Sequence, residues 1–302
     1  MAQIFVSGLI NIETTVRIEA FPIAYEPVRY PFFGVRSTVS GVGYNVAKAL
    51  ATLGDTVRLA ALIGRDAAGT LVAEYLRADG LPGEHVLARL DETAQSAILY
   101  DRAGRRMINT DLKDIQETAY PLDRFEQAIA GCDLAVLCNI NYSRPLLAQA
   151  KRRGIPVATD VHAIGCLDDA YNRDFMAAAD ILFLSDERLP CAPEEWMRQL
   201  WNEFAAPIVV VGLGAQGALL GVRADGFVGR FPAVQTRPVV NTIGAGDALF
   251  SAFVRFYRSS GAPYEAIRRA ITFASYKVGA AGAADGFLDA AALERLHATV
   301  QW

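Results

Sequence analysis

The chain has 302 residues, of which 52% are hydrophobic and 21% charged, enough apolar material for one large domain or two modest ones. This composition also argues against disorder for most of the chain. Its 29 basic and 33 acidic residues give a net charge of −4 without a long basic block, which argues against a nucleic-acid partner. No basic leader precedes the first apolar run, and no apolar stretch reaches about 18 residues. We therefore expect a soluble, cytoplasmic protein without a membrane partner. Its four cysteines form no C-x-x-C pair and its three histidines are far apart, so no zinc site is expected.

Apolar strand-like runs alternate with helical ones along most of the chain. Strands are predicted at 57–63, 134–139, 156–160, 181–184 and 208–211, and helices at 46–54, 67–78, 144–153, 194–204, 248–258 and 264–281. This β-α-β alternation predicts an α/β fold, a doubly wound and mostly parallel sheet with helices on both faces. The uninterrupted apolar runs 135–137 and 208–211 are typical of central strands.

Two segments, 14–39 and 95–113, break this rhythm. Both contain alternating β-rich residues, and the second has a turn at 101–104. We interpret them as antiparallel strands of a small, discontinuous lid over the substrate site, with the α/β core formed by 1–13, 40–94 and 114–302. Ordinary edge hairpins are the alternative. Pairing of lid strands between two chains would make a homodimer.

The stretch 241–247, Asn-Thr-Ile-Gly-Ala-Gly-Asp, carries the strongest chemical pattern. Gly244, Ala245 and Gly246 add little bulk before a helix, so their amides can approach an anion at its positive end. Asp247 is well placed there to accept a proton from a hydroxyl that attacks phosphorus. Alternatively, the stretch is only a glycine-rich helix start that Asp247 caps.

Two further glycine clusters adjoin predicted elements. Gly41, Gly43 and Asn45 precede a helix, and the amide of Asn45 can both donate to and accept from a polyhydroxylated ligand. The dinucleotide fingerprint would need glycine at 46, where valine stands, which argues against a dehydrogenase. Residues 212–217 predict a strand-turn-strand that contacts a nucleotide or forms a plain β-turn. No Walker A lysine is present.

In this order, residues 8–13, 41–45, 212–217 and 241–247 resemble the ribokinase or PfkB family of carbohydrate and nucleoside kinases. The resemblance covers essentially the whole chain. Its most specific element is the late signature D-T-x-G-A-G-D, which the chain matches at every fixed position except the first. It implies a ribokinase-like fold, ATP and Mg²⁺ as cofactors, and transfer of the γ-phosphoryl group to a primary hydroxyl of a sugar.

The resemblance also implies a role for individual positions. Asp247 matches the general base, and Gly244, Ala245 and Gly246 match the anion hole. The implied substrate-binding residues are Asn11, Glu13, Gly41, Gly43 and Asn45, with Glu13 where the family usually has aspartate. The implied nucleotide-binding residues are Gly214, Gly217, Thr242 and Ser275.

The metal environment departs from the family pattern. The family's N-x-x-E motif should fall at 184–188, where Asp186 or Glu187 offers the magnesium ligands instead, unless both belong to a solvated turn. Asp160 is a further candidate near metal or phosphates, and His162 beside it has no assigned role. Asn241 replaces an aspartate that the family associates with a monovalent-cation site, which puts potassium activation in doubt.

Two alternatives to a sugar kinase stay open. The stretches 11–13, 41–45 and 138–140 also resemble pseudouridine kinases within the family, which would make the acceptor a nucleoside. The residues Ser185, Arg188 and Asn241 would suit a relative that binds sugar or nucleotide without catalysis.

Overall fold

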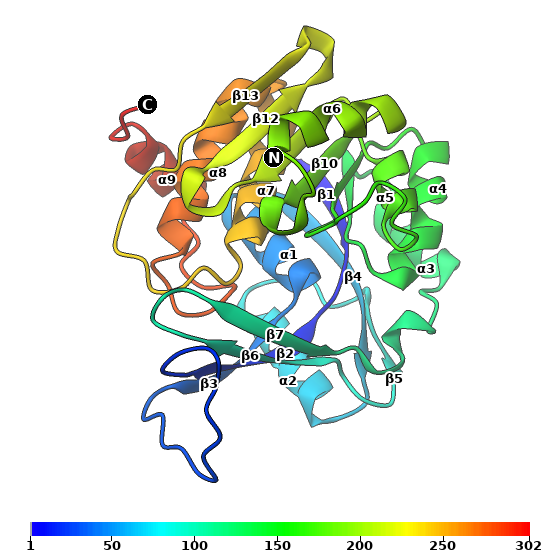
Figure 1. The fold of residues 1–302 in the computed structure, drawn as a ribbon. Coiled ribbons are helices and arrows are strands. Elements are labelled where there is room, and N and C mark those ends of the chain that lie inside the picture. The colour runs from blue at the N-terminus through cyan, green and yellow to red at the C-terminus, as the bar shows by residue number, and fades with distance from the viewer. Residues whose placement is uncertain (1) are drawn as a thin grey trace.

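The computed structural model describes residues 2–302, which form two sheets (Figure 1). Across the larger sheet, the strands lie in the order β13 (Phe227–Phe231), β12 (Ala218–Val222), β11 (Ile208–Gly212), β10 (Ile181–Ser185), β9 (Val157–Asp160), β8 (Leu134–Leu137), β1 (Gln3–Ser7), β4 (Thr56–Gly64) and β5 (Val86–Leu90). The strands from β11 to β5 are parallel, and β12 and β13 are antiparallel. The predicted doubly wound, mostly parallel sheet is confirmed.

Helices cover both faces of this sheet, because successive strand residues point to opposite sides. Ile4 and Val6 of β1 pack into one core, and Phe5 between them packs into the other. The first core is covered by α1 (Val42–Thr52), α2 (Ala67–Ala78), α7 (Ala245–Ser260), α8 (Pro263–Lys277) and α9 (Ala290–His297). The second is covered by α3 (Leu122–Ile129), α4 (Arg144–Arg152), α5 (Arg173–Ala178) and α6 (Pro193–Glu203). Because the strands from β11 to β5 are parallel, their carboxyl ends all lie at one edge of the sheet.

The smaller sheet lies apart from the larger one, in the lower part of Figure 1. Its order is β3 (Val35–Ser40), β2 (Asn11–Arg17), β6 (Gln95–Tyr100) and β7 (Arg106–Asp111). The pairs β2–β3 and β6–β7 are antiparallel, as expected, and the parallel pair β2–β6 joins them into one mixed sheet. This is the lid, and it is not a set of edge hairpins on the main sheet.

Residues 18–34, between β2 and β3, form a loop rather than further strands. Pro22, Pro27 and Pro31 lie in this loop, and proline cannot donate to a strand ladder. Within residues 2–302, no helix has the length and apolar character needed to span a membrane.

Candidate active site

A cavity of about 240 Å³ lies between the lid and the core. The lid contributes Asn11, Glu13, Ser40, Ser96, Ile98, Arg106, Ile108 and Thr110 to its wall. The core contributes Leu9, Gly41, Val42, Asn45, Asp160, His162, Thr242, Ile243, Gly244, Ala245, Gly246, Asp247 and Ala283. Asp160 ends β9, so the cavity includes the carboxyl edge of the parallel sheet, where α/β folds bind ligands.

The start of α7 forms part of the cavity wall. Gly244 precedes the helix with φ of 75°, and a Cβ there would lie 2.4 Å from the Ala283 carbonyl oxygen, so only glycine fits without strain. The Ala245 amide donates to the Thr242 carbonyl at 3.2 Å. Within residues 2–302, the amides of Gly244, Gly246 and Asp247 have no acceptor. The free donors of the expected anion site are therefore at 244, 246 and 247.

Asp247 is 8% exposed, and its Oδ2 accepts a 2.7 Å hydrogen bond from Asn45 Nδ2 of α1. Among the described residues, no backbone amide of α7 donates to this carboxylate, which argues against a capping role. Burial raises the pKa of the Asp247 carboxyl, and the hydrogen bond from Asn45 and the nearby His162 oppose that effect. A buried carboxylate with a raised pKa beside free helix amides has the properties of a general base for an attacking hydroxyl.

A polar network extends from Asn45 into the lid. Ser40 Oγ lies 3.1 Å from Glu13 Oε2 and 3.3 Å from Asn45 Oδ1. Asn11 Nδ2 donates to Ser96 Oγ at 2.6 Å, and Ser96 Oγ lies 3.2 Å from Thr110 Oγ1.

Two buried oxygens of this network, Asn11 Oδ1 and Glu13 Oε1, have no hydrogen-bond partner within residues 2–302. Burial raises the pKa of Glu13, and the Ser40 hydroxyl opposes that effect. Because buried acceptors are almost always paired, these two oxygens are suited to ligand hydroxyls.

The two glycines before α1 have different surroundings. Gly41 lines the cavity with φ of 103°, and a Cβ there would lie 2.5 Å from the Leu9 carbonyl oxygen. Gly43 does not line the cavity. Its Cβ would lie 2.4 Å from the carbonyl carbon of Gly8, so glycine at 43 allows α1 to pack closely against the end of β1.

The expected nucleotide residues separate into two groups. Thr242 lines the cavity, whereas Gly214, Gly217 and Ser275 lie outside its wall. Gly214 begins a turn between β11 and β12, which confirms the predicted strand-turn-strand. Ser275 Oγ accepts from the Thr236 amide at 3.1 Å and donates to the Val234 carbonyl at 2.5 Å, so this hydroxyl anchors the segment after β13.

The expected metal ligands lie just after β10, in a short 3₁₀ helix, η3 (Asp186–Arg188). Glu187 Oε1 accepts from Arg106 Nη2 at 3.2 Å. His162 and Asp160 both line the cavity, and the His162 amide donates to Asp160 Oδ1 at 2.8 Å. Within residues 2–302, no three His, Cys, Asp or Glu side chains come close enough to hold a metal ion by themselves.

Arg106 is a further functional candidate, and no local sequence motif identifies it. From β7 of the lid, it donates to Thr242 Oγ1 at 3.2 Å as well as to Glu187. It therefore connects the lid to the segment that precedes α7 and to η3. Ser40, Ser96 and the buried Lys277 were not singled out either, because a serine or a lysine carries no local pattern that reveals such contacts.

A parallel α/β sheet, a separate lid and a buried carboxylate beside free helix amides define a phosphotransferase that acts on a small molecule. Residues 1–290 match the pfkB family of carbohydrate kinases, and the chain belongs to this family. It is a carbohydrate kinase, a phosphotransferase with an alcohol acceptor, and its family uses ATP.

The chain is similar to several kinases along nearly their whole length. It is 28% identical to an acarbose 7(IV)-phosphotransferase from an Actinoplanes species, over 97% of each chain. It is 27% identical to an ATP-dependent ribose-1-phosphate kinase from Halopiger xanaduensis, over 94% of each. Among solved structures, a microbiome-derived acarbose kinase superimposes with a TM-score of 0.88 and 26% identity, over 98% of this chain and 99% of that one. Ribokinase from Thermotoga maritima, 21% identical with a TM-score of 0.79, shares the fold over 98% of this chain and 99% of its own.

Proposed function

We propose that this kinase transfers the γ-phosphoryl group of ATP to a primary hydroxyl of a sugar, with Asp247 as general base. The observation that carries the proposal is the position of the Asp247 carboxylate, which is buried in the cavity wall, oriented by Asn45, and next to free amides at the start of α7. The start of α7 thereby supplies both a base for the acceptor hydroxyl and hydrogen-bond donors for the transferred group.

In the proposed step, the acceptor hydroxyl gives its proton to Asp247 as its oxygen attacks the γ-phosphorus. The new O–P bond forms while the bond from that phosphorus to the bridging oxygen of ADP breaks. The amides of Gly244, Gly246 and Asp247 offset the negative charge on the group in transfer. Asn11 and Glu13 accept hydrogen bonds from other hydroxyls of the sugar. The lid consists of the predicted segments 14–39 and 95–113 together with the strand residues 11–13 and 40, and it excludes water.

The nucleotide would bind along Gly214, Gly217, Thr242 and Ser275, with Mg²⁺ on its phosphates. When bound, Mg²⁺ would neutralise phosphate charge. Asp186 and Glu187 fit such a metal as outer ligands, because Mg²⁺ in phosphoryl-transfer sites is held largely by phosphates and water. Asp186 makes no ion pair within the described residues, whereas Glu187 is shared with Arg106.

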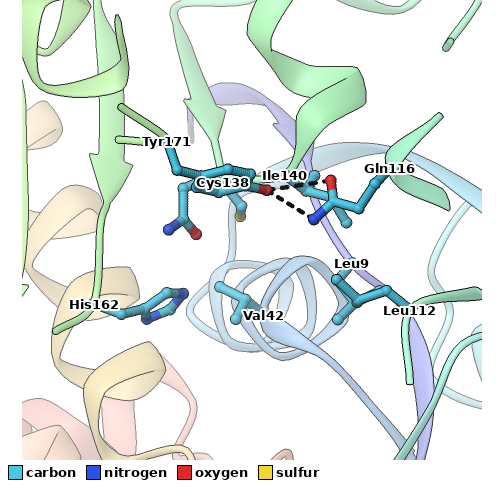
Figure 2. A pocket seen from close by; sticks show the side chains of 9 residues that line it. Leu9, Val42, Leu112, Gln116, Cys138, Ile140, His162 and Tyr171 are labelled. Carbon is cyan, nitrogen blue, oxygen red and sulfur yellow. Dashed lines mark hydrogen bonds between the residues drawn. The ribbon is translucent and has the colours of Figure 1, made fainter. Parts of the chain in front are cut away.

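A second candidate acceptor is a nucleoside, and a neighbouring cavity favours it. This cavity measures about 250 Å³ and shares Leu9, Val42 and His162 with the first one (Figure 2). Tyr171 lies on its wall, and Gln116 Nε2 donates to the Tyr171 hydroxyl at 3.0 Å. A planar tyrosine beside an apolar wall suits a second ring attached to the phosphorylated sugar.

The test is ATP turnover on a panel of free sugars, glycosides and nucleosides, with Asp247→Asn alongside the native enzyme. Turnover that Asp247→Asn abolishes supports the proposal, whereas binding without any turnover would leave a non-catalytic relative. Tyr171→Ala separates the two acceptor classes. A nucleoside kinase should lose acceptor affinity in this variant, and a kinase of free sugars should not.

We also propose that two chains pair through the lid. The loop 18–34 carries an exposed apolar set, Tyr25, Val28, Tyr30, Phe32 and Phe33, beside the edge strand β3. Several exposed apolar side chains next to an unpaired strand edge are typical of an interface. A monomeric mass in solution at micromolar concentration would contradict this arrangement.

A further inference from the structure

Lys277, the last residue of α8, is completely buried, although lysine is almost never buried without a partner. Its ammonium donates a hydrogen bond to the backbone carbonyl of Ile243. Ile243 directly precedes Gly244, so this contact holds the backbone from which the free amides of α7 begin.

Asn241 completes the same junction. Its Nδ2 donates to the Ala281 carbonyl at 2.6 Å, and its Oδ1 accepts from the Ile243 amide at 3.1 Å. Because a carbonyl can only accept and an amide N–H can only donate, these partners fix the orientation of the side-chain amide. Two nitrogens, Lys277 Nζ and Asn241 Nδ2, thus point at the two carbonyl oxygens, Ile243 O and Ala281 O.

These residues do not fit the monovalent cation that the family resemblance implies beside position 241. A bound alkali cation needs free carbonyl and carboxylate oxygens. Here, the Ile243 and Ala281 carbonyls each already accept a hydrogen bond from a side-chain nitrogen, and an amide stands at 241 instead of a carboxylate. A second positive charge beside Lys277 would also be repelled.

The surrounding charges favour the ammonium. Asp247, Glu13 and Asp285 attract it, while Arg106 repels it. Burial lowers the pKa of Lys277 to about 8, so the side chain still carries its charge at neutral pH.

We infer that the Lys277 ammonium is the built-in cation of this kinase, a positioning residue that holds the Ile243 carbonyl and orients the amides at 244–247, so that the enzyme needs no monovalent cation. The inference rests on the proposed role of those amides. The Lys277 ammonium, which is attached to the chain, takes the place that a dissociable ion would fill.

The experiment compares the native enzyme with Lys277→Met in potassium chloride, ammonium chloride and choline chloride at equal ionic strength. The native enzyme should react at the same rate in all three salts. Lys277→Met should lose about 10²-fold in kcat, the cost of misplacing transition-state contacts. Potassium or ammonium should restore only part of that loss, because Asn241 still donates to the Ala281 carbonyl, and choline should restore none. Lys151→Met, which removes a surface lysine paired with Asp180, is the matched control.

The double variant Asn241→Asp with Lys277→Met sharpens the test, because it restores the carboxylate and frees the Ile243 carbonyl. It should acquire a dependence on potassium that the native enzyme lacks. Activation of the native enzyme by potassium over choline, or full activity of Lys277→Met in choline, would overturn the inference.

Thermal unfolding in the same salts supplies a readout without any acceptor. Potassium should leave the native midpoint where choline leaves it, and should raise that of the double variant by about 2 °C or more. A potassium-specific rise in the native protein would overturn the inference even if Lys277→Met failed to fold. If no sugar or nucleoside were phosphorylated, these midpoints would still decide the cation question separately from the proposed function.

Discussion

Asn45 and Asp247 are 202 residues apart in the chain, and Asn45 Nδ2 donates a 2.7 Å hydrogen bond to Asp247 Oδ2. The contact joins the first turn of α1 to the first turn of α7. Because the donor contacts the carboxylate directly, it both orients Asp247 and favours its ionised form. The proposed base is therefore controlled by a residue from the opposite end of the sequence.

Because Asn45 contacts Asp247, we expect this contact to influence the pH below which kcat/KM falls. Burial raises the pKa of Asp247 above its ordinary 3.8, and the Asn45 hydrogen bond lowers it. The base must be ionised, so kcat/KM should fall at a higher pH than for an exposed aspartate. Asn45→Leu should move that acid limb further upward. The measurement is a pH profile at saturating ATP, with the exposed Asn202→Leu as control, and an unmoved limb would contradict the assignment of Asp247 as base.

Asp247→Asn should gain stability while losing turnover. The folded pKa is raised, so Asp247 favours the folded state below the ordinary value near 3.8, and this contribution is lost as pH rises through the folded pKa. At pH 7 the buried charge is destabilising, and a neutral amide removes it. We expect Asp247→Asn to have a higher urea midpoint than the native protein at pH 7, and the difference between the two midpoints to close toward pH 4. Its kcat should fall by about 10²- to 10⁴-fold.

An exposed counterpart, Asp174→Asn, controls for the general effect of removing a carboxylate. A lower midpoint for Asp247→Asn at pH 7 would show that the folded protein stabilises the Asp247 charge, which would contradict the raised pKa of Asp247.

Arg106→Ala should weaken the connection between the lid and the core. Arg106 donates to Thr242 Oγ1 and to Glu187 Oε1, both at 3.2 Å. Hydrogen bonds with a charged partner contribute about 1.5–3 kcal/mol, so kcat/KM should fall by about 10- to 100-fold. Arg105→Ala is a matched control on the same hairpin, because Arg105 pairs with Asp101 of the lid instead. Equal losses in both variants would mean that only the hairpin had been disturbed.

Local patterns were sufficient to predict most of the core. Buried parallel strands such as β8 and β11 are continuous apolar runs, which sequence reasoning can recognise. The edge strands β5 and β13 were not predicted, because exposed residues such as Arg89 and Arg230 interrupt their pattern. The end of α8 was also misplaced, at 281 rather than Lys277.

The residues that line the candidate site could be predicted from the sequence where they are contiguous in it. Gly244 to Asp247 and Gly41 to Asn45 are local motifs, and the fold brings both to one cavity. Arg106, Ser40 and Lys277 depend on contacts between distant segments, such as the one from Lys277 to Ile243. A lysine at the end of a helix is most often a solvated charge near the negative dipole end, so burial alone distinguishes Lys277.

Gly244 and Gly246 differ in why each is glycine, and alanine substitutions should separate the two reasons. Gly244 has φ of 75°, and a Cβ there would lie 2.4 Å from the Ala283 carbonyl oxygen, so Gly244→Ala should cost about 1–3 kcal/mol of folding free energy. A Cβ at Gly246 meets no atom within 4 Å, so Gly246→Ala should leave stability unchanged or slightly raised.

The same methyl at 246 lies in the cavity wall beside a free amide, where it would hinder the approach of the transferred group. We therefore expect Gly246→Ala to lower kcat in a protein of native stability. Urea unfolding and initial rates on the same preparations check both expectations. A fully active Gly246→Ala would mean that the phosphoryl group does not approach this amide, and the anion site would then have to be sought elsewhere along the loop.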